Sequence, residues 1–173
     1  MKYKVIDNFL EKEQYESLKN LIKNLDFPWR RRYNLTEDYH PSNEGYFTFC
    51  FYNHFQSQSE WFEPFIVPIL NKLKTATVIQ VRANMHLKEL FKEPKIPFHI
   101  DYDNLSKFKT CILNFSNDGG TKIKINNNEY SINALENRLL IMDGNTLHST
   151  IRNDKLSRRF LLNLNYIPYE SNT

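Results

Sequence analysis

The spacing of apolar and polar positions changes along the chain near residue 76. Before that point, residues 11–25 repeat apolar side chains at helical intervals, with acidic residues early and lysines later. This pattern is typical of an amphipathic helix. Residues 59–73 predict a second helix, and the apolar runs 5–10 and 46–52 predict strands. The first part of the chain is therefore expected to supply both helices of the fold.

From residue 76 onward, short apolar runs alternate with turn-forming residues. The separators are rich in Asn, Asp and Gly, as in residues 117–120, and these residue types favour tight turns. Two helices followed by many strands predict a mainly β protein with N-terminal helices, a jelly roll or sandwich with the helices packed on one sheet. The predicted strands cover residues 77–85, 107–115, 121–125, 129–132, 138–142, 147–151 and 158–167.

Length and composition exclude several classes of protein. A chain of 173 residues predicts a single domain, and no apolar run approaches the roughly 18 residues of a membrane span. Cys50 and Cys111 are too few for a disulfide scaffold, and the charged first residues do not resemble a signal peptide. We therefore expect a cytoplasmic protein. The net charge of +3 is too small to favour nucleic acid or a membrane surface as partner.

One cluster of residue types points to metal chemistry. His99 and Asp101 are two residues apart, so their side chains share one face of an extended segment. His148 lies 47 residues after Asp101, at the start of a predicted strand that a jelly roll can return to the same place. Two imidazoles and one carboxylate on one face of an octahedral ion leave three positions open, as in non-haem Fe(II) oxygenases.

Two arginines open the last predicted strand. Arg158 and Arg159 follow His148 by ten and eleven residues and precede an apolar run that has no need of a cation. A guanidinium binds a carboxylate through two parallel hydrogen bonds. Strand alternation points one arginine to each face, and both faces of such a sheet can be buried. The pattern alone leaves open which arginine faces the metal.

In this order, these motifs resemble the 2-oxoglutarate/Fe(II)-dependent dioxygenase superfamily, in its prolyl-4-hydroxylase-like branch. The resemblance implies a double-stranded β-helix over residues 76–167, with 1–75 as helical support and lid, in one oxygenase domain spanning 1–173. Residues 26–60 match nothing in the family. The stretches that carry the resemblance are 5–10, 99–101, 109–115, 119–121, 137–144, His148 and Arg158 or Arg159.

The resemblance also implies the cofactors and the reaction. Fe(II) is expected on His99, Asp101 and His148, and the distal carboxylate of the cosubstrate 2-oxoglutarate on Arg159, which aligns better than Arg158. With O2, such an enzyme hydroxylates its substrate and releases succinate and CO2. A protein side chain such as proline is the favoured substrate, with a nucleic acid or a small metabolite next.

Two further groups of polar residues have open interpretations. Gln80, Arg82 and Asn84 share one face of a predicted strand, where they either line the cofactor cavity or form an exposed edge. The run Arg30-Arg31-Arg32 either contacts phosphates or bases, or is a solvated charged face.

Two other functions fit the same metal ligands. Two histidines and a carboxylate also suit a zinc hydrolase, although the helical HExxH motif is absent and Arg159 then has no role. A metal-binding jelly-roll module without turnover is the other alternative. Consumption of 2-oxoglutarate in the presence of Fe(II) distinguishes the three.

Overall fold

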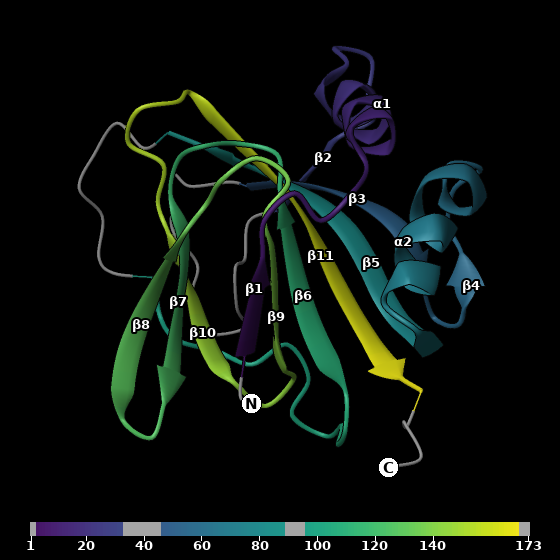
Figure 1. Ribbon diagram of the computed structural model, residues 1–173. Coiled ribbons are helices and arrows are strands. Elements are labelled where there is room, and N and C mark those ends of the chain that lie inside the picture. The colour runs from purple at the N-terminus through teal and green to yellow at the C-terminus, as the bar shows by residue number, and fades with distance from the viewer. Residues whose placement is uncertain (1–2, 33–45, 89–95, 170–173) are drawn as a thin grey trace.

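The computed structural model describes residues 3–32, 46–88 and 96–169, which form two antiparallel sheets and a helical layer (Figure 1). Neither helix in these ranges is long and apolar enough to cross a membrane. In chain order the elements are β1 Tyr3–Ile6, α1 Lys12–Lys23, β2 Arg30–Arg32, β3 Tyr46–Asn53, β4 Gln56–Ser57, a π-helical turn η1 Phe62–Ile66, α2 Val67–Lys72, β5 Thr75–Leu87, β6 Lys109–Asn114, β7 Gly120–Ile125, β8 Asn128–Asn133, β9 Leu139–Asp143, β10 Leu147–Ile151 and β11 Arg158–Pro168.

The larger sheet has the strand order β1-β9-β6-β11-β5-β3-β2, with β4 paired to β3, and the smaller sheet has the order β10-β7-β8. Every paired strand is antiparallel. A small apolar cluster that includes Ile123 of β7, Leu140 of β9 and Leu161 of β11 joins the two sheets. Two antiparallel sheets that face each other across such a layer agree with the predicted jelly roll.

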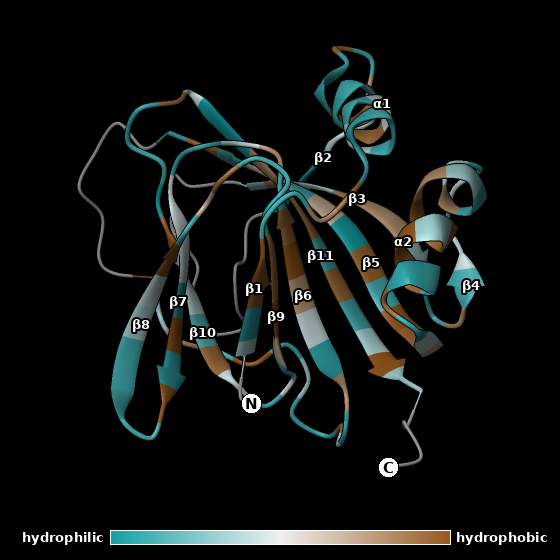
Figure 2. Ribbon diagram, viewed as in Figure 1, coloured by the Kyte–Doolittle hydropathy of each residue, from teal (hydrophilic) through white to brown (hydrophobic). Residues whose placement is uncertain are grey.

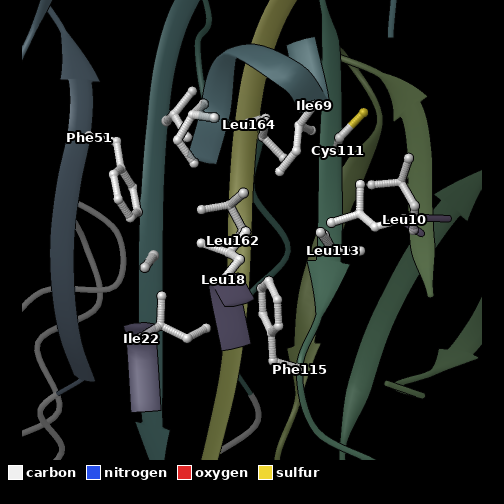
Figure 3. Packing of buried hydrophobic residues seen from close by; sticks show 14 of the residues in the cluster. Leu10, Leu18, Ile22, Phe51, Ile69, Cys111, Leu113, Phe115, Leu162 and Leu164 are labelled. Carbon is white, nitrogen blue, oxygen red and sulfur yellow. The ribbon is translucent and has the colours of Figure 1, made fainter. Parts of the chain in front are cut away.

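The main hydrophobic core lies on the other face of the larger sheet. Leu18 and Ile22 of α1 and Ile69 of α2 belong to the same buried cluster as Leu162 and Leu164 of β11 (Figure 3). Beside them, the rings of Tyr15 and Phe115 stack with centroids 5.3 Å apart. The helical residues and the sheet therefore share one core.

The two faces of the larger sheet have different chemistry. Polar and apolar residues alternate along β5 (Figure 2), and successive side chains of a strand point to opposite faces. Val81, Ala83 and Met85 enter the main core, so Arg82 and Asn84 point to the face that meets the smaller sheet. We call this second face the inner face.

Strands and helices appear where the sequence predicted them, apart from the short strand β4, which was not predicted, and three further differences. The predicted strand 5–10 is β1, Tyr3–Ile6, because Asn8 has a positive φ of 52° that ends the extended backbone. The predicted helix 59–73 divides into η1 and α2, in which Pro64 and Pro68 lack the N–H of a regular helix. Arg30–Arg32, where the sequence predicted no strand, forms β2. Residues 33–45 lie outside the described residues.

Candidate metal centre

Two of the three predicted ligands lie on neighbouring extended segments. His148 is in β10, and His99 forms an isolated antiparallel bridge with it. Each residue donates its backbone N–H to the carbonyl oxygen of the other at 2.9 Å. Ser149 adds a side-chain hydrogen bond to the Ile96 carbonyl at 2.7 Å. The segment that carries His99 is thus fixed along the edge of the smaller sheet.

Asp101 completes the group. Its Oδ1 atom lies 3.8 Å from Nε2 of His99 and 3.7 Å from Nε2 of His148. One ion bonded to each of these donors at about 2 Å can bridge such distances. All three ligand atoms lie within 4.8 Å of one another. The fold therefore brings together donor atoms from two segments that are 47 residues apart.

The protonation states of the histidines suit metal binding. Nδ1 of His148 lies 3.0 Å from the carbonyl oxygen of Thr146, which requires the proton on Nδ1 and leaves the lone pair of Nε2 available. Burial lowers the pKa of His99, and the neighbouring His148 lowers it further, against the opposing effect of Asp101. The lowered pKa of His99 favours the neutral imidazole that a metal ion requires.

A chain of polar side chains on the inner face holds the Asp101 carboxylate. Asn163 of β11 donates to Oδ2 of Asp101 at 3.4 Å, and Asn165 donates to Oδ1 of Asn163 at 3.0 Å. Thr110 of β6 in turn donates to Asn165 at 2.8 Å. Burial opposes ionisation of Asp101, but His148, Arg82 and His99 outweigh it, and the pKa of this carboxyl stays below its usual value.

Arg159 is completely buried on the same face of β11 as Asn163, while Arg158 is exposed. Its Nη1 donates to the Ile151 carbonyl at 3.1 Å and its Nη2 to Oδ1 of Asn114 at 3.2 Å. Its Nε is buried and has no hydrogen-bond partner. Burial lowers the pKa of Arg159 to about 10, with Asp118 acting in the opposite direction. The cation forms no salt bridge with any described residue.

Asp118 fixes the loop that leads into β11. Its Oδ2 accepts the backbone N–H groups of Lys155 at 2.8 Å and Leu156 at 2.7 Å. Burial alone would raise the pKa of Asp118, but these backbone donors, together with Asp154, hold it below its ordinary value. The loop that positions Arg159 therefore depends on a carboxylate that stays ionised.

The other predicted site residues lie on the inner face at different depths. Arg82 is half-buried, and its charge helps to lower the pKa of both Asp101 and His99. Asn84 is buried and accepts a hydrogen bond from Thr48 of β3 at 3.1 Å. Arg30 and Arg32 are exposed on the edge strand β2. Arg82 thus influences the metal ligands through its charge, whereas Asn84 links β5 to β3 through its hydrogen bond.

Sequence reasoning missed several residues that support this site. The polar residues Asn163 and Asn165 at alternate positions of an apolar strand were a signal that its inner face is not a simple core. Nothing in the sequence near Asn114 or Asp118 indicated their contacts, because their partners lie 45 and 36–38 residues away.

No family model and no curated protein matches the sequence. Solved structures do match. An oxidoreductase of the 2OG-Fe(II) oxygenase family from Burkholderia pseudomallei superimposes with a TM-score of 0.72, over 95% of this chain and 85% of that one, at 9% identity. The chain has the fold of the 2OG-Fe(II) oxygenases. The resemblance expected from the sequence is confirmed in the fold.

Two other structures with the oxygenase fold are similar to this chain. A Trichoplax adhaerens prolyl hydroxylase in complex with a peptide fragment of hypoxia inducible factor gives a TM-score of 0.68 at 12% identity, over 96% of this chain and 83% of that one. HygX from Streptomyces hygroscopicus, with nickel and 2-oxoglutarate bound, gives a TM-score of 0.62 at 11% identity, over 98% of this chain and 84% of that one.

Proposed function

We propose that this chain is an Fe(II)- and 2-oxoglutarate-dependent oxygenase that hydroxylates a protein side chain. The observation that carries the proposal is the buried guanidinium of Arg159 on the same inner face as Asn163, the residue that holds Asp101. A buried cation is costly unless an anion pairs with it. Among the described residues no carboxylate forms that pair, so a carboxylate ligand is the natural partner.

The residues present fit both groups. His99, Asp101 and His148 form a donor set of two imidazoles and one carboxylate, which suits Fe(II) and leaves positions for other ligands. Nε of Arg159 is a buried donor that a distal carboxylate can satisfy. When bound, Fe(II) with 2-oxoglutarate and O2 supplies the oxidation that hydroxylates a C–H bond and yields succinate and CO2.

The protein's own part is to hold the metal ligands and Arg159 in fixed positions. The Thr146 carbonyl keeps His148 in the tautomer that presents Nε2, and Asn163 orients the Asp101 carboxylate. The bonds to Asn114 and Ile151 hold Arg159 in one place, so a ligand carboxylate meets an already oriented donor. Zinc hydrolysis uses the same three ligands but gives Arg159 no role, and this favours the oxygenase.

A peptide is the substrate class we favour, with proline as the first residue to test. The Trichoplax adhaerens neighbour was solved with a peptide fragment, which supports this choice by analogy of fold. A cytoplasmic location is part of the proposal, since Cys50 and Cys111 are both free thiols.

Ligand binding tests the proposal with three acids of matched chemistry. We would titrate 2-oxoglutarate, pyruvate and glutarate into Mn(II)-loaded protein by calorimetry. Pyruvate lacks the distal carboxylate and glutarate lacks the 2-oxo group, so 2-oxoglutarate should bind at least about 30-fold more tightly than either. Equal binding of pyruvate would contradict the role of Arg159, and no binding of 2-oxoglutarate would contradict the oxygenase.

A further inference from the structure

Arg30 and Arg32 point to the same face of the sheet as the metal centre. In the register of β2, β3 and β5, Arg30 lies opposite Thr48, and Thr48 opposite Asn84. Residues opposite each other in a sheet share a face, and Asn84 is on the inner face. Arg31, between them, points to the other side.

The same register places Cys50 beside Arg82. Cys50 of β3 lies opposite Arg82, and Arg82 lies opposite Asn163, which binds Asp101. The charge of Arg82 acts on Asp101 as well as on Cys50, and Cys50 also experiences the charges of Arg32 and Arg30. A continuous positive zone thus runs from the metal ligands to the edge of the sheet.

The three arginines have no anionic partner of their own in the described part of the chain. Arg30 and Arg32 are exposed and form no salt bridge there, and Nε of Arg82 is buried without a hydrogen-bond partner. Asp101, whose pKa the charge of Arg82 lowers, is assigned to the metal. Like charges that face each other are unfavourable, so the zone is suited to an anionic ligand.

The length of this zone indicates what kind of anion it suits. Arg82 and Arg30 are two strands and one two-residue step apart, which corresponds to roughly 12 Å between their Cα atoms. Arg82 lies beside the metal ligands, whereas Arg30 and Arg32 are on the open edge. A ligand that meets all three has to extend from the metal to the edge, as three residues of extended peptide do.

We propose that the substrate is an acidic peptide whose carboxylate side chains, about three residues from the oxidised residue, bind Arg30 and Arg32, while Arg82 continues the positive zone to the metal ligands. The inference rests on the proposed function and specifies its substrate class. Arg30 and Arg32 are specificity residues at the entrance, and Arg82 aligns the acidic chain near the metal. Free small acids carry the same charge but do not extend along the zone.

A pair of labelled peptides tests this inference. One contains a proline followed, three residues later, by two glutamates, and the other has glutamines in their place; both carry an uncharged fluorophore. Binding is followed by fluorescence anisotropy with Zn(II)-loaded protein at low salt. We expect the acidic peptide to bind roughly 3- to 10-fold more tightly, as exposed charge pairs allow, and 0.5 M salt to remove the difference.

Two double variants of equal charge separate this zone from general charge effects. Arg30→Gln/Arg32→Gln should abolish the preference for the acidic peptide, whereas Arg31→Gln/Arg158→Gln, with both changes facing away, should keep it. Equal affinity for the two peptides, or the same loss in both variants, would overturn the inference. Competition by N-acetylglutamate as strong as that by unlabelled acidic peptide would overturn it in favour of a small acid.

Cys50 provides a measurement that needs no peptide. Cys111 is fully buried and Cys50 is half-buried, so a thiol reagent reaches Cys50 first. The quantity to measure is the rate with the dianionic reagent DTNB divided by the rate with uncharged dithiodipyridine. We expect this ratio to be at least twofold higher in the wild type than in Arg30→Gln/Arg32→Gln. An unchanged ratio would contradict a positive zone. Neither assay requires turnover, so consumption of 2-oxoglutarate tests the proposed function separately.

Discussion

His99 and His148 exchange both of their backbone hydrogen bonds, each N–H donating to the other's carbonyl oxygen at 2.9 Å. This bridge sets the two imidazoles side by side, with ring centroids 4.5 Å apart. The backbone therefore positions two ligands before any ion binds. A pre-formed site of this kind loses little free energy to ordering when the ion arrives.

The first prediction concerns the metal ligands. His99→Ala or Asp101→Ala should abolish binding of a single divalent ion, because each removes one of three donor atoms that lie within 4.8 Å of one another. His54→Asn is the control, since His54 is exposed at a turn with a φ of 50° that Asn tolerates. Calorimetric titration with Mn(II) measures the effect. Undiminished affinity in both ligand variants would refute the site.

The second prediction separates the two neighbouring arginines. Losing a buried arginine–carboxylate contact costs about 2 to 5 kcal/mol, so Arg159→Ala should weaken 2-oxoglutarate binding by roughly 30-fold to several thousand-fold. Arg158→Ala should change it little, because Arg158 is exposed. Binding is measured on Mn(II)-loaded protein after thermal melts show that each variant is folded.

Arg159→Lys provides the check on packing for this second prediction. A lysine keeps the charge and fills most of the volume but cannot form two parallel hydrogen bonds, so binding should still weaken. Large loss in Arg158→Ala with none at position 159 would reverse the assignment.

The third prediction concerns stability at Asn137. Its side chain accepts from the N–H of Leu10 and donates to the carbonyl of Leu10, both at 2.8 Å, and its φ is 58°. Asn137→Ala loses two buried hydrogen bonds and strains the backbone, which together should cost about 2 to 4 kcal/mol of unfolding free energy. Asn127→Ala, in an exposed turn with a φ of 65°, should cost only about 1 kcal/mol. Urea unfolding measures both; equal costs would mean that the Leu10 contacts are unimportant.

The fourth prediction concerns pH. Burial, and then the charge of Arg159, lowers the pKa of His86 to about 3, whereas an unfolded histidine titrates near 6.5. Between these values the unfolded chain binds a proton that the folded protein does not. The unfolding free energy should therefore fall as the pH drops from about 6.5 towards 3.

A variant isolates the contribution of His86 from that of the other titrating groups. His86→Phe keeps a ring against Tyr46, on which His86 stacks with centroids 5.4 Å apart. This variant should lose less stability than the wild type between pH 7 and pH 4.5 in urea unfolding. An identical pH dependence in the two proteins would show that His86 titrates normally when folded.

Much of the fold and of the site could be predicted from local pattern. The strands after residue 76 alternate apolar and polar residues, and the spacing of His99 and Asp101 places both on one face. What could not be predicted depends on contacts between distant residues. One such contact joins Asp118 to the backbone N–H groups of residues 154–156, which are 36 to 38 residues away in the sequence. Another is the pairing of β2 with β3, because this pairing determines that Arg30 and Arg32 face the side of the metal centre.

The most direct test of the central proposal is formation of succinate from 2-oxoglutarate, followed by proton NMR under air with Fe(II) added. The wild type should convert 2-oxoglutarate to succinate with Fe(II), but not with Zn(II), and Asp101→Ala should show no conversion above the rate of free iron. Equal rates in wild type and Asp101→Ala, or no succinate from the folded, metal-loaded wild type, would contradict the assignment as an oxygenase.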